Sequence, residues 1–341
     1  MPYELNNIYV EKIQLFYDID PWYVEDNYPV TFTSTNERVA IVDEEGVVTA
    51  LKKGTTTIQA VLEGSSLRAS VKITVNSEFV IENRTLIAYK GLGGEVVIPN
   101  DEGILYIGAF AFCLYDTDNT IELTEEDYDA NKIPSTNTTV TSIVIPDTVQ
   151  EIQKYAFYNC VGLKKVTIPS SVRFIREYAF CGDAKLETVD LSNVEAIGAR
   201  AFSGCSKLTL DPEKDLRKTY SIGDRAFENC TSITSVDLTT LRNTGKEAFK
   251  GCSSLETVVL GEKTKLSYAM FVRSGVKNIV LYETLEIPAY CFAECKDLES
   301  VTFKNDIWRI GNGAFCENEK LATVNFEGSV DIIGEQAFYD C

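Results

Sequence analysis

Two patterns of apolar and polar positions divide the chain. Up to residue 75, apolar and polar residues alternate in short runs rich in Val, Ile and Thr, such as Val30-Thr-Phe-Thr-Ser. Alternation with a period of two, interrupted by turns such as Glu63-Gly64-Ser65, predicts strands. The expected strands span residues 30–34, 39–42, 46–50, 56–61 and 69–75. Short strands at this spacing indicate a small β-sandwich.

The second pattern is a nine-residue phrase that returns from residue 107 to the end. In full it reads Ile-Gly, two variable residues, Ala-Phe, two variable residues and Cys, as in Ile222-Gly-Asp-Arg-Ala-Phe-Glu-Asn-Cys230. Its phenylalanines lie at positions 112, 157, 180, 202, 227, 249, 271, 292, 315 and 338. After a first gap of 45 residues, the spacing stays between 21 and 25. A fixed period of this length predicts a repeat array.

A strand-like element lies between successive phrases. It has the form Leu-x-x-Val-x-Ile, as in Leu163-Lys-Lys-Val-Thr-Ile168. This unit fits a leucine-rich repeat, in which one short strand and a turn or 3₁₀ segment form each coil. A single coil cannot bury its apolar residues, so stacked coils must share ladders of Val, Ile, Ala and Phe. We therefore expect a mainly β chain with a solenoid of about ten coils and a parallel sheet, roughly 45 Å long.

These patterns place the domain boundary just after Val75. We assign residues 1–76 to the β-sandwich and residues 77–341 to the solenoid. Residues 79–99 form an N-terminal cap region, with a hairpin expected to cover the first edge of the array, and residues 113–139 form an acidic insertion. The chain stops at Cys341, inside a repeat rather than after a polar cap, so we expect a solenoid truncated at its C-terminus.

The amino-acid sequences of both segments resemble known families. The stretch Val39-Ala-Ile-Val-Asp-Glu-Glu-Gly-Val-Val-Thr-Ala50 and its surroundings resemble bacterial Ig-like domains of group 2. The repeated phrase resembles the BspA-like, or bacterial surface antigen, type of leucine-rich repeat. The first resemblance implies a spacer or adhesive module of a bacterial surface protein. The second implies a curved or twisted solenoid that is secreted or displayed on the cell surface, with adhesion as its role.

The composition narrows the classes of function. The absence of histidine removes Ser-His-Asp and Cys-His catalytic pairs and every histidine-containing zinc site. We therefore expect no enzyme and no cofactor. A net charge of -19 disfavours nucleic acid, because neutralising phosphates needs Lys and Arg.

Membrane and export signals are missing from the sequence as given. No run approaches the roughly 18 apolar residues that span a bilayer. The start Met1-Pro-Tyr-Glu lacks the basic and apolar regions of a signal peptide. We expect no membrane insertion of this segment, and an extracellular location whose export signal and anchor lie outside this chain.

Six of the ten cysteines follow the repeated Phe by three residues, at positions 160, 205, 230, 252, 295 and 341. A ladder of buried thiols competes with a redox or metal role. The ladder is favoured, because free Cys packs as a small hydrophobe and no Cys-x-x-Cys spacing is present. Cys113, Cys181 and Cys316 follow Phe directly and are expected to be exposed or to form isolated bridges. We expect few disulfides and no metal site.

Two further features invite a specific interpretation. The segment from Tyr115 to Asp129 holds seven carboxylates, and Asp116, Asp118 and Asp127 resemble part of a calcium-binding loop. The match is poor, because an Ile stands where the EF-hand loop requires Gly, so a solvated or partner-facing loop is favoured. Trp22 suits a binding anchor, although a core or interdomain packing role is favoured.

The outward positions of the strand face are the default binding surface of a solenoid. Here they are small and mostly uncharged, with no aromatic stripe and no basic patch, so a featureless solvated sheet is an equal alternative. The candidate ligand-binding residues are Thr167, Asp190, Asp237, Thr302 and Asn325.

We predict a non-catalytic bacterial surface or secreted protein that binds a host or neighbouring-cell macromolecule, either a protein or a glycan. One alternative is an architectural stalk or surface-layer component, which would self-associate. The other is a carbohydrate-binding accessory module of a larger secreted protein, which exposed Trp or Tyr platforms would favour.

Overall fold

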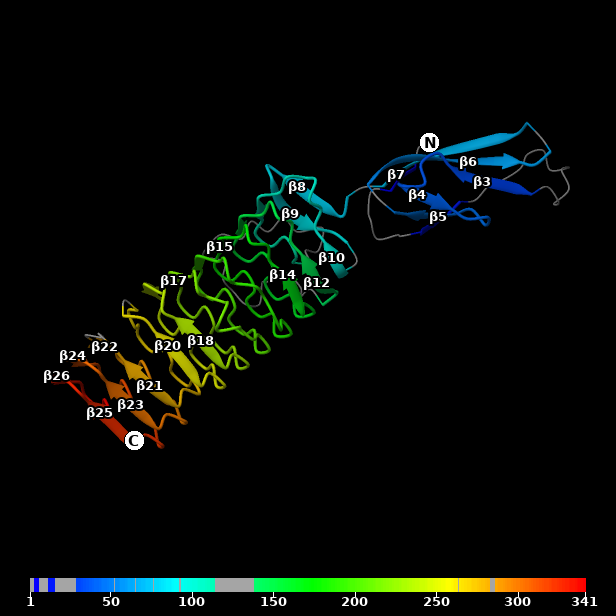
Figure 1. Cartoon of the computed structure of the whole chain (residues 1–341). Helices are drawn as coiled ribbons and strands as arrows, with labels where there is room; N and C mark the ends of the chain where they lie inside the picture. The colour runs from blue at the N-terminus through cyan, green and yellow to red at the C-terminus, as the bar shows by residue number, and fades with distance from the viewer. Residues whose placement is uncertain are drawn as a thin grey trace. The chain divides into compact units, whose positions relative to one another are not determined.

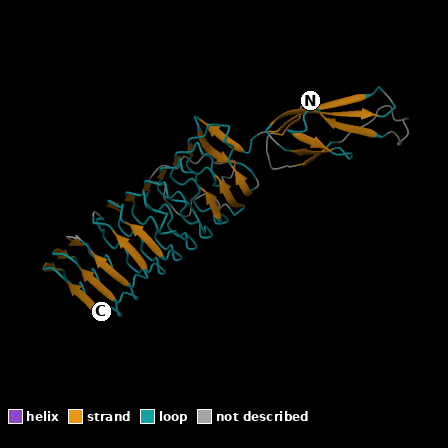
Figure 2. Ribbon diagram, in the orientation of Figure 1, coloured by secondary structure: helices purple, strands orange, loops and turns teal. Residues whose placement is uncertain are grey.

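The computed structural model describes residues 3–5, 12–15, 29–51, 53–64, 66–75, 77–91, 93–113, 138–262, 264–282 and 286–341. Within these ranges the chain forms strands and turns and no helix (Figure 2). It divides into two compact units. The first contains residues 1–80 and 90–92, and the second contains residues 81–89 and 93–341 (Figure 1).

The first unit is a β-sandwich. One sheet has the order β1-β7-β6-β3, and the other has the order β2-β5-β4. These strands span Tyr3–Leu5 (β1), Lys12–Gln14 (β2), Val30–Ser34 (β3), Ala40–Val42 (β4), Val47–Ala50 (β5), Gly54–Leu62 (β6) and Arg68–Val75 (β7). Val48 from one sheet packs with Ile58 and Ile73 from the other in the core. The predicted sandwich is confirmed, since alternation turns every second side chain inward.

The second unit is a stack of coils, and the Leu-x-x-Val-x-Ile segments form its first parallel ladder (Figure 1). Its strands are Gly94–Val97 (β10), Val140–Val144 (β12), Lys165–Thr167 (β14), Ser235–Leu238 (β18), Thr257–Leu260 (β20), Asn278–Leu281 (β21), Ser300–Phe303 (β23) and Thr323–Phe326 (β25). Between β14 and β18 the ladder narrows to single bridges through Thr188 and Thr209. The predicted solenoid with a parallel sheet is confirmed.

Most coils also join a second parallel ladder, which is interrupted at the coil of Leu266. It is built from the Ile of the phrase and the residue before it, so that Ile197 pairs with Ile222. Its strands are Thr85–Tyr89 (β9), Tyr106–Ile107 (β11), Glu151–Ile152 (β13), Phe174–Ile175 (β15), Ala196–Ile197 (β16), Ser221–Ile222 (β17), Asn243–Thr244 (β19), Glu286–Ile287 (β22), Ile307–Ile310 (β24) and Val330–Ile333 (β26). The expectation of one strand per coil with a turn or 3₁₀ segment is therefore wrong for the described coils. When coils stack, any two extended residues of one coil can form backbone hydrogen bonds with the next coil. Such a strand is too short to show the alternation from which strands are predicted.

A hairpin lies at the first edge of the second ladder. β8 (Phe79–Glu82) is the edge strand beside β9, and β9 pairs in parallel with β11. Asn83 and Arg84 join the hairpin with φ of 48° and 63°, as a two-residue type I′ turn requires. The Tyr89 ring stacks on Phe112 at 5.2 Å, so the hairpin also covers the first Phe of the array.

The Ala-Phe part of the phrase forms the third side of each coil, which we call the turn face. Three amides of one coil donate hydrogen bonds to three carbonyls of the next, as Arg200, Phe202 and Gly204 donate to Asp224, Ala226 and Glu228. The first and third donors have positive φ, 52° for Arg200 and 80° for Gly204. Because of these left-handed residues, the third side of the coil is a turn rather than a strand, but its amides still donate hydrogen bonds to the next coil.

The repeated Phe side chains form a continuous stack inside the array. From Phe157 to Phe338 the neighbouring ring centroids lie 4.9–5.6 Å apart. All rings but the last are fully buried. The prediction that the phrase specifies core packing is confirmed.

The cysteines of the phrase form a ladder beside this stack. The thiol of Cys205 donates to the carbonyl of Phe180 one coil back at 3.1 Å, and Cys230 does the same to Phe202. Burial raises the pKa of the Cys252 thiol to about 12, so it stays protonated and able to donate. All ten cysteines are free, and five of the six that follow Phe by three residues are buried, as a ladder of packed thiols requires.

The cysteines that follow Phe directly differ from expectation. Cys113 and Cys316 are buried and Cys181 is half-buried, and none of the three forms a disulfide. The expectation of exposed or bridged thiols is wrong for Cys113 and Cys316, because this position packs against the neighbouring coils rather than facing solvent alone.

Candidate functional site

The turn face displays two columns of variable side chains. The lead column holds the residue two before each repeated Phe: Phe110, Tyr155, Tyr178, Arg200, Arg225, Glu247, Ala269, Tyr290, Gly313 and Gln336. The trail column holds the residue directly after it: Cys113, Tyr158, Cys181, Ser203, Glu228, Lys250, Val272, Ala293, Cys316 and Tyr339. Every lead residue has a φ between 51° and 62°, so successive side chains leave the same backbone geometry one coil apart.

The first coils carry aromatic rings in these columns. Phe110 stacks on Tyr155 with centroids 4.9 Å apart, and Tyr155 contacts Tyr178 at 5.0 Å. Tyr158 of the trail column meets Tyr155 edge to face. Tyr155 is buried, and this burial raises the pKa of its hydroxyl. The aromatic part of the turn face is therefore mainly packed against itself.

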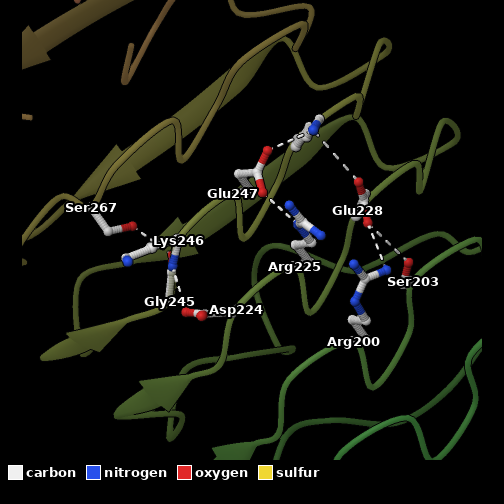
Figure 3. Close-up of polar contacts among 10 residues, drawn as sticks. Arg200, Ser203, Asp224, Arg225, Glu228, Gly245, Lys246, Glu247 and Ser267 are labelled. Atoms are coloured by element: carbon white, nitrogen blue, oxygen red, sulfur yellow. Dashed lines mark hydrogen bonds and ion pairs between the residues drawn. The ribbon is translucent and has the colours of Figure 1, made fainter. Parts of the chain in front are cut away.

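The middle coils carry charges that neutralise one another (Figure 3). Arg200 reaches Glu228 at 3.4 Å, and Arg225 pairs with Glu247. Lys250 lies between the two acids, 2.6 Å from Glu247 and 3.8 Å from Glu228. Desolvation opposes ionisation of Glu247, but hydrogen bonds from Lys250 and Arg225 hold its pKa below the usual range. This band supplies donors and acceptors with little net charge.

The later coils form a pocket of about 220 Å³ on the turn face. Its floor is apolar and buried, and consists of Ala269, Val272, Ala293 and Cys316. Tyr268 and Tyr290 bound it, with ring centroids 5.9 Å apart and exposed fractions of 46% and 40%. Charged side chains from the neighbouring columns complete the rim: Glu247, Lys250, Arg273, Glu294 and Glu317.

Small lead residues on either side of Tyr290 open this pocket. Ala269 precedes it and Gly313 follows it in the column. A Cβ on Gly313 would lie 2.6 Å from the Tyr290 ring, so the ring rests on the glycine. The absence of a side chain at Gly313 thus sets the position of Tyr290.

The candidate residues named from the sequence lie on the first ladder rather than on the turn face. Thr302 and Asn325 are register partners on β23 and β25, and Thr167 lies on β14. Asp190 pairs with Lys214 at 2.5 Å, and Asp237 pairs with Arg217 at 3.3 Å. The ladder therefore brings Thr302 and Asn325 together, whereas the two aspartates are occupied by cations of the segment at 211–220. A binding role for the five residues stays a prediction.

The strand pattern of the sequence does not reveal the pocket, because its residues recur from coil to coil at the variable positions before and after each Phe. Unlike the strand face as predicted from the sequence, the turn face exposes aromatic side chains at Tyr268 and Tyr290. Aligning the two variable residues before each Ala-Phe would have placed Tyr290 between Ala269 and Gly313. Trp22 and the acidic segment Tyr115–Asp129 lie outside the described residues.

Neither metal nor membrane chemistry is indicated where the structure is described. Those residues contain no group of three or more Cys, Asp or Glu placed to hold a metal ion. Among them, no helix has the length and apolar character needed to cross a membrane.

A parallel two-ladder solenoid with a preceding Ig-like sandwich defines the class of protein. The profile of the BspA type leucine rich repeat region matches residues 131–211 and 220–341 in six copies, which is more than half of the chain. The chain belongs to this family. The profile of the bacterial Ig-like domain (group 2) matches residues 18–73.

Several solved structures share similarity with the chain. A leucine rich cell surface protein from Faecalibacterium prausnitzii A2-165 is 22% identical, covers 77% of this chain and 78% of its own, and gives a TM-score of 0.44. The pneumococcal vaccine antigen PcpA is 18% identical, with 78% and 76% covered and a TM-score of 0.48. A leucine-rich repeat protein from Bacteroides ovatus ATCC 8483 is 21% identical, with 77% and 90% covered and a TM-score of 0.40. No curated protein matches the chain.

Proposed function

We propose that this chain is a non-catalytic, surface-displayed bacterial protein that binds an extracellular protein of a host or neighbouring cell through its turn face. The pocket bounded by Tyr268 and Tyr290 carries this proposal. Tyrosines are favoured at protein interfaces because they bury a large apolar area and keep a polar tip. Membership of the BspA-type family supports display outside a bacterial cell.

The turn face suits a binding surface for mechanical reasons as well. From the coil of Tyr155 to that of Gly313, three hydrogen bonds to the next coil fix the backbone around each lead residue. A rigid frame lowers the entropy lost on binding, because side chains are held in place before the partner arrives. The variable columns can therefore differ from coil to coil without loss of the frame.

A biosensor panel of immobilised fibronectin, collagen, laminin and mucin tests the proposal. The unmodified chain should bind at least one protein, and Tyr268→Ala/Tyr290→Ala should weaken that binding at least tenfold, the loss of a contact of about 1.4 kcal/mol or more. The matched variant Thr302→Arg/Asn325→Arg alters the first ladder and should bind normally. Loss of binding only in the second variant would instead locate the site on the strand face predicted from the sequence.

A glycan-binding module is the second candidate, because exposed tyrosine rings also serve as platforms for sugars. In that case the panel would show binding to mucin that disappears after enzymatic removal of its glycans. An architectural stalk predicts a third pattern, in which nothing on the panel binds and the chain forms oligomers by light scattering.

A further inference from the structure

The pocket at Tyr268 and Tyr290 has the features of a receptor for one cationic side chain. Building on the proposed function, we propose that it binds a single arginine or lysine side chain of the protein partner. The aromatic walls, the apolar floor and an acidic group on the rim each match one part of such a side chain.

Size is the first argument. Pockets for whole small molecules usually span about 300–1,000 Å³, whereas this one is about 220 Å³. A single long side chain is therefore a better match than a separate organic ligand. The buried floor at Ala269, Val272 and Ala293 offers only apolar surface, which suits the methylene stem that Lys and Arg bury while their charged ends stay in water.

The array itself shows how an arginine is held on an aromatic ring. Arg200 lies over Tyr178, its neighbour in the lead column, with Cζ 6.0 Å from the ring centroid. Its guanidinium then reaches the Glu228 carboxylate at 3.4 Å. On the second ladder Arg176 lies over Phe174 at 5.1 Å. An aromatic face combined with a carboxylate from another coil is thus an arginine site that this chain already uses.

The same arrangement at Tyr290 lacks the arginine. The lead residue after Tyr178 is Arg200, but the residue after Tyr290 is Gly313, which has no side chain. Across the part of the chain that the structure describes, no arginine or lysine lies over the Tyr268 or Tyr290 ring. A partner's guanidinium or ammonium group would fill this role by a cation–π contact.

Charge favours a cation over an anion or a neutral group. Glu247 and Glu294 are already paired, with Lys250 and Arg273 respectively. Among the described residues Glu317 forms no ion pair, and its side chain is exposed at the rim. The chain as a whole has a net charge of -19, which steers cationic partners toward it. Glu317 lies close enough to Arg273 to favour its charged form, but no ion pair joins the two, so this carboxylate can still receive a bound cation.

Saturation-transfer NMR with N-acetyl-arginine methylamide in 0.15 M NaCl tests the assignment. We expect saturation transfer to the side-chain methylenes of the probe. Tyr268→Ala/Tyr290→Ala should abolish it without altering net charge, and Glu317→Gln should weaken it at least threefold. Matched controls are Tyr220→Ala, an exposed tyrosine elsewhere, and Glu187→Gln, an equal change of charge on the first ladder. Both should leave the transfer unchanged.

Three outcomes would overturn the inference. One is no transfer to the probe in the unmodified chain, and another is equal transfer in the tyrosine variant. The third is transfer to methyl β-galactoside in place of the arginine probe, which would make the pocket a sugar site. Gly313→Ala gives a second check, because lifting the Tyr290 ring should reduce transfer while the array stays folded, as Ala269 shows that this column accepts alanine. If the arginine probe does not bind but Tyr268→Ala/Tyr290→Ala still weakens binding of the protein ligand, the proposed function is retained and only the inference of a cationic side chain is rejected.

Discussion

At the Cys position of the phrase, the choice of side chain determines whether the buried polar groups around it form hydrogen bonds. Asn318 occupies the place that Cys holds in other coils. Its amide nitrogen donates to the carbonyls of Phe292 and Phe315 at 2.9 Å, and its oxygen accepts from the Cys295 amide at 2.7 Å. Asp183 occupies the same place with the same shape. Both of its carboxyl oxygens are buried without a hydrogen bond, since the Cys160 amide donates to Phe157 instead.

Asp183→Asn is expected to stabilise the array. Burial raises the pKa of Asp183 well above its usual range. A folded pKa above the unfolded value means that the native state loses stability as pH rises past the unfolded carboxyl pKa of about 3.9. The amide cannot ionise and can donate like Asn318, so the gain should reach about 1–3 kcal/mol at pH 7 and be small at pH 4.

Thermal unfolding at pH 4, 5.5 and 7 measures this gain. Asp211→Asn, an aspartate in a more exposed position on the chain, is the matched control and should change stability little at any of these pH values. A gain of equal size at pH 4 and pH 7 would contradict the assignment of a buried, protonated acid.

At the scale of the element, the sequence predicts what is repeated and apolar. The Phe stack, the Cys ladder and the strand at Leu-x-x-Val-x-Ile follow from residue type and period. The second ladder does not, because a strand such as β16 has two residues and shows no alternation. The positive φ of the lead column could not be predicted either, because Tyr, Arg and Glu have no preference for the left-handed region. There the hydrogen bonds to the next coil impose the left-handed conformation, at a local steric cost of about 1–2 kcal/mol per residue.

Cys230→Ala tests the contribution of one rung of the thiol ladder. It removes the donor to the Phe202 carbonyl and leaves a small cavity, so we expect a loss of about 1–3 kcal/mol in unfolding free energy. Cys230→Ser should lose less, because Ser274 occupies this place in another coil and is buried there. Hydrogen exchange of the amides near Phe202 should rise more in the Ala variant. Equal hydrogen exchange in both variants would show that the hydrogen bond from the thiol does not contribute to stability.

At the scale of the molecule, the two units have separate cores. Among the described residues, the sandwich is built around Ile58 and Ile73 and the array around its Phe stack. Candidate site residues on the turn face come from coils some 20 residues apart in sequence and meet only because the coils stack. For this reason the fold class was predictable from one chain, whereas the pocket required the register between coils.

Removal of residues 1–76 is expected to leave the melting temperature of the array unchanged, because neighbouring coils supply its stability. Removal of residues 1–104 should lower it, since the hairpin that covers Ile107 and Phe112 is then lost. Differential scanning calorimetry of the three chains distinguishes the cases. A drop in melting temperature on removing residues 1–76 alone would refute independent stability.

The hydrogen-bonded turn of each coil has a consequence for how such proteins diversify. Each coil from that of Tyr178 to that of Gly313 donates from three amides to one neighbour and accepts at three carbonyls from the other, so the backbone contacts of these coils are interchangeable. Gain or loss of one coil by gene recombination would move the tyrosine pocket relative to the aromatic and charged bands by one step, without altering any of them. Insertion or deletion of coils can therefore change the spacing between binding elements of the turn face without changing the residues that form them.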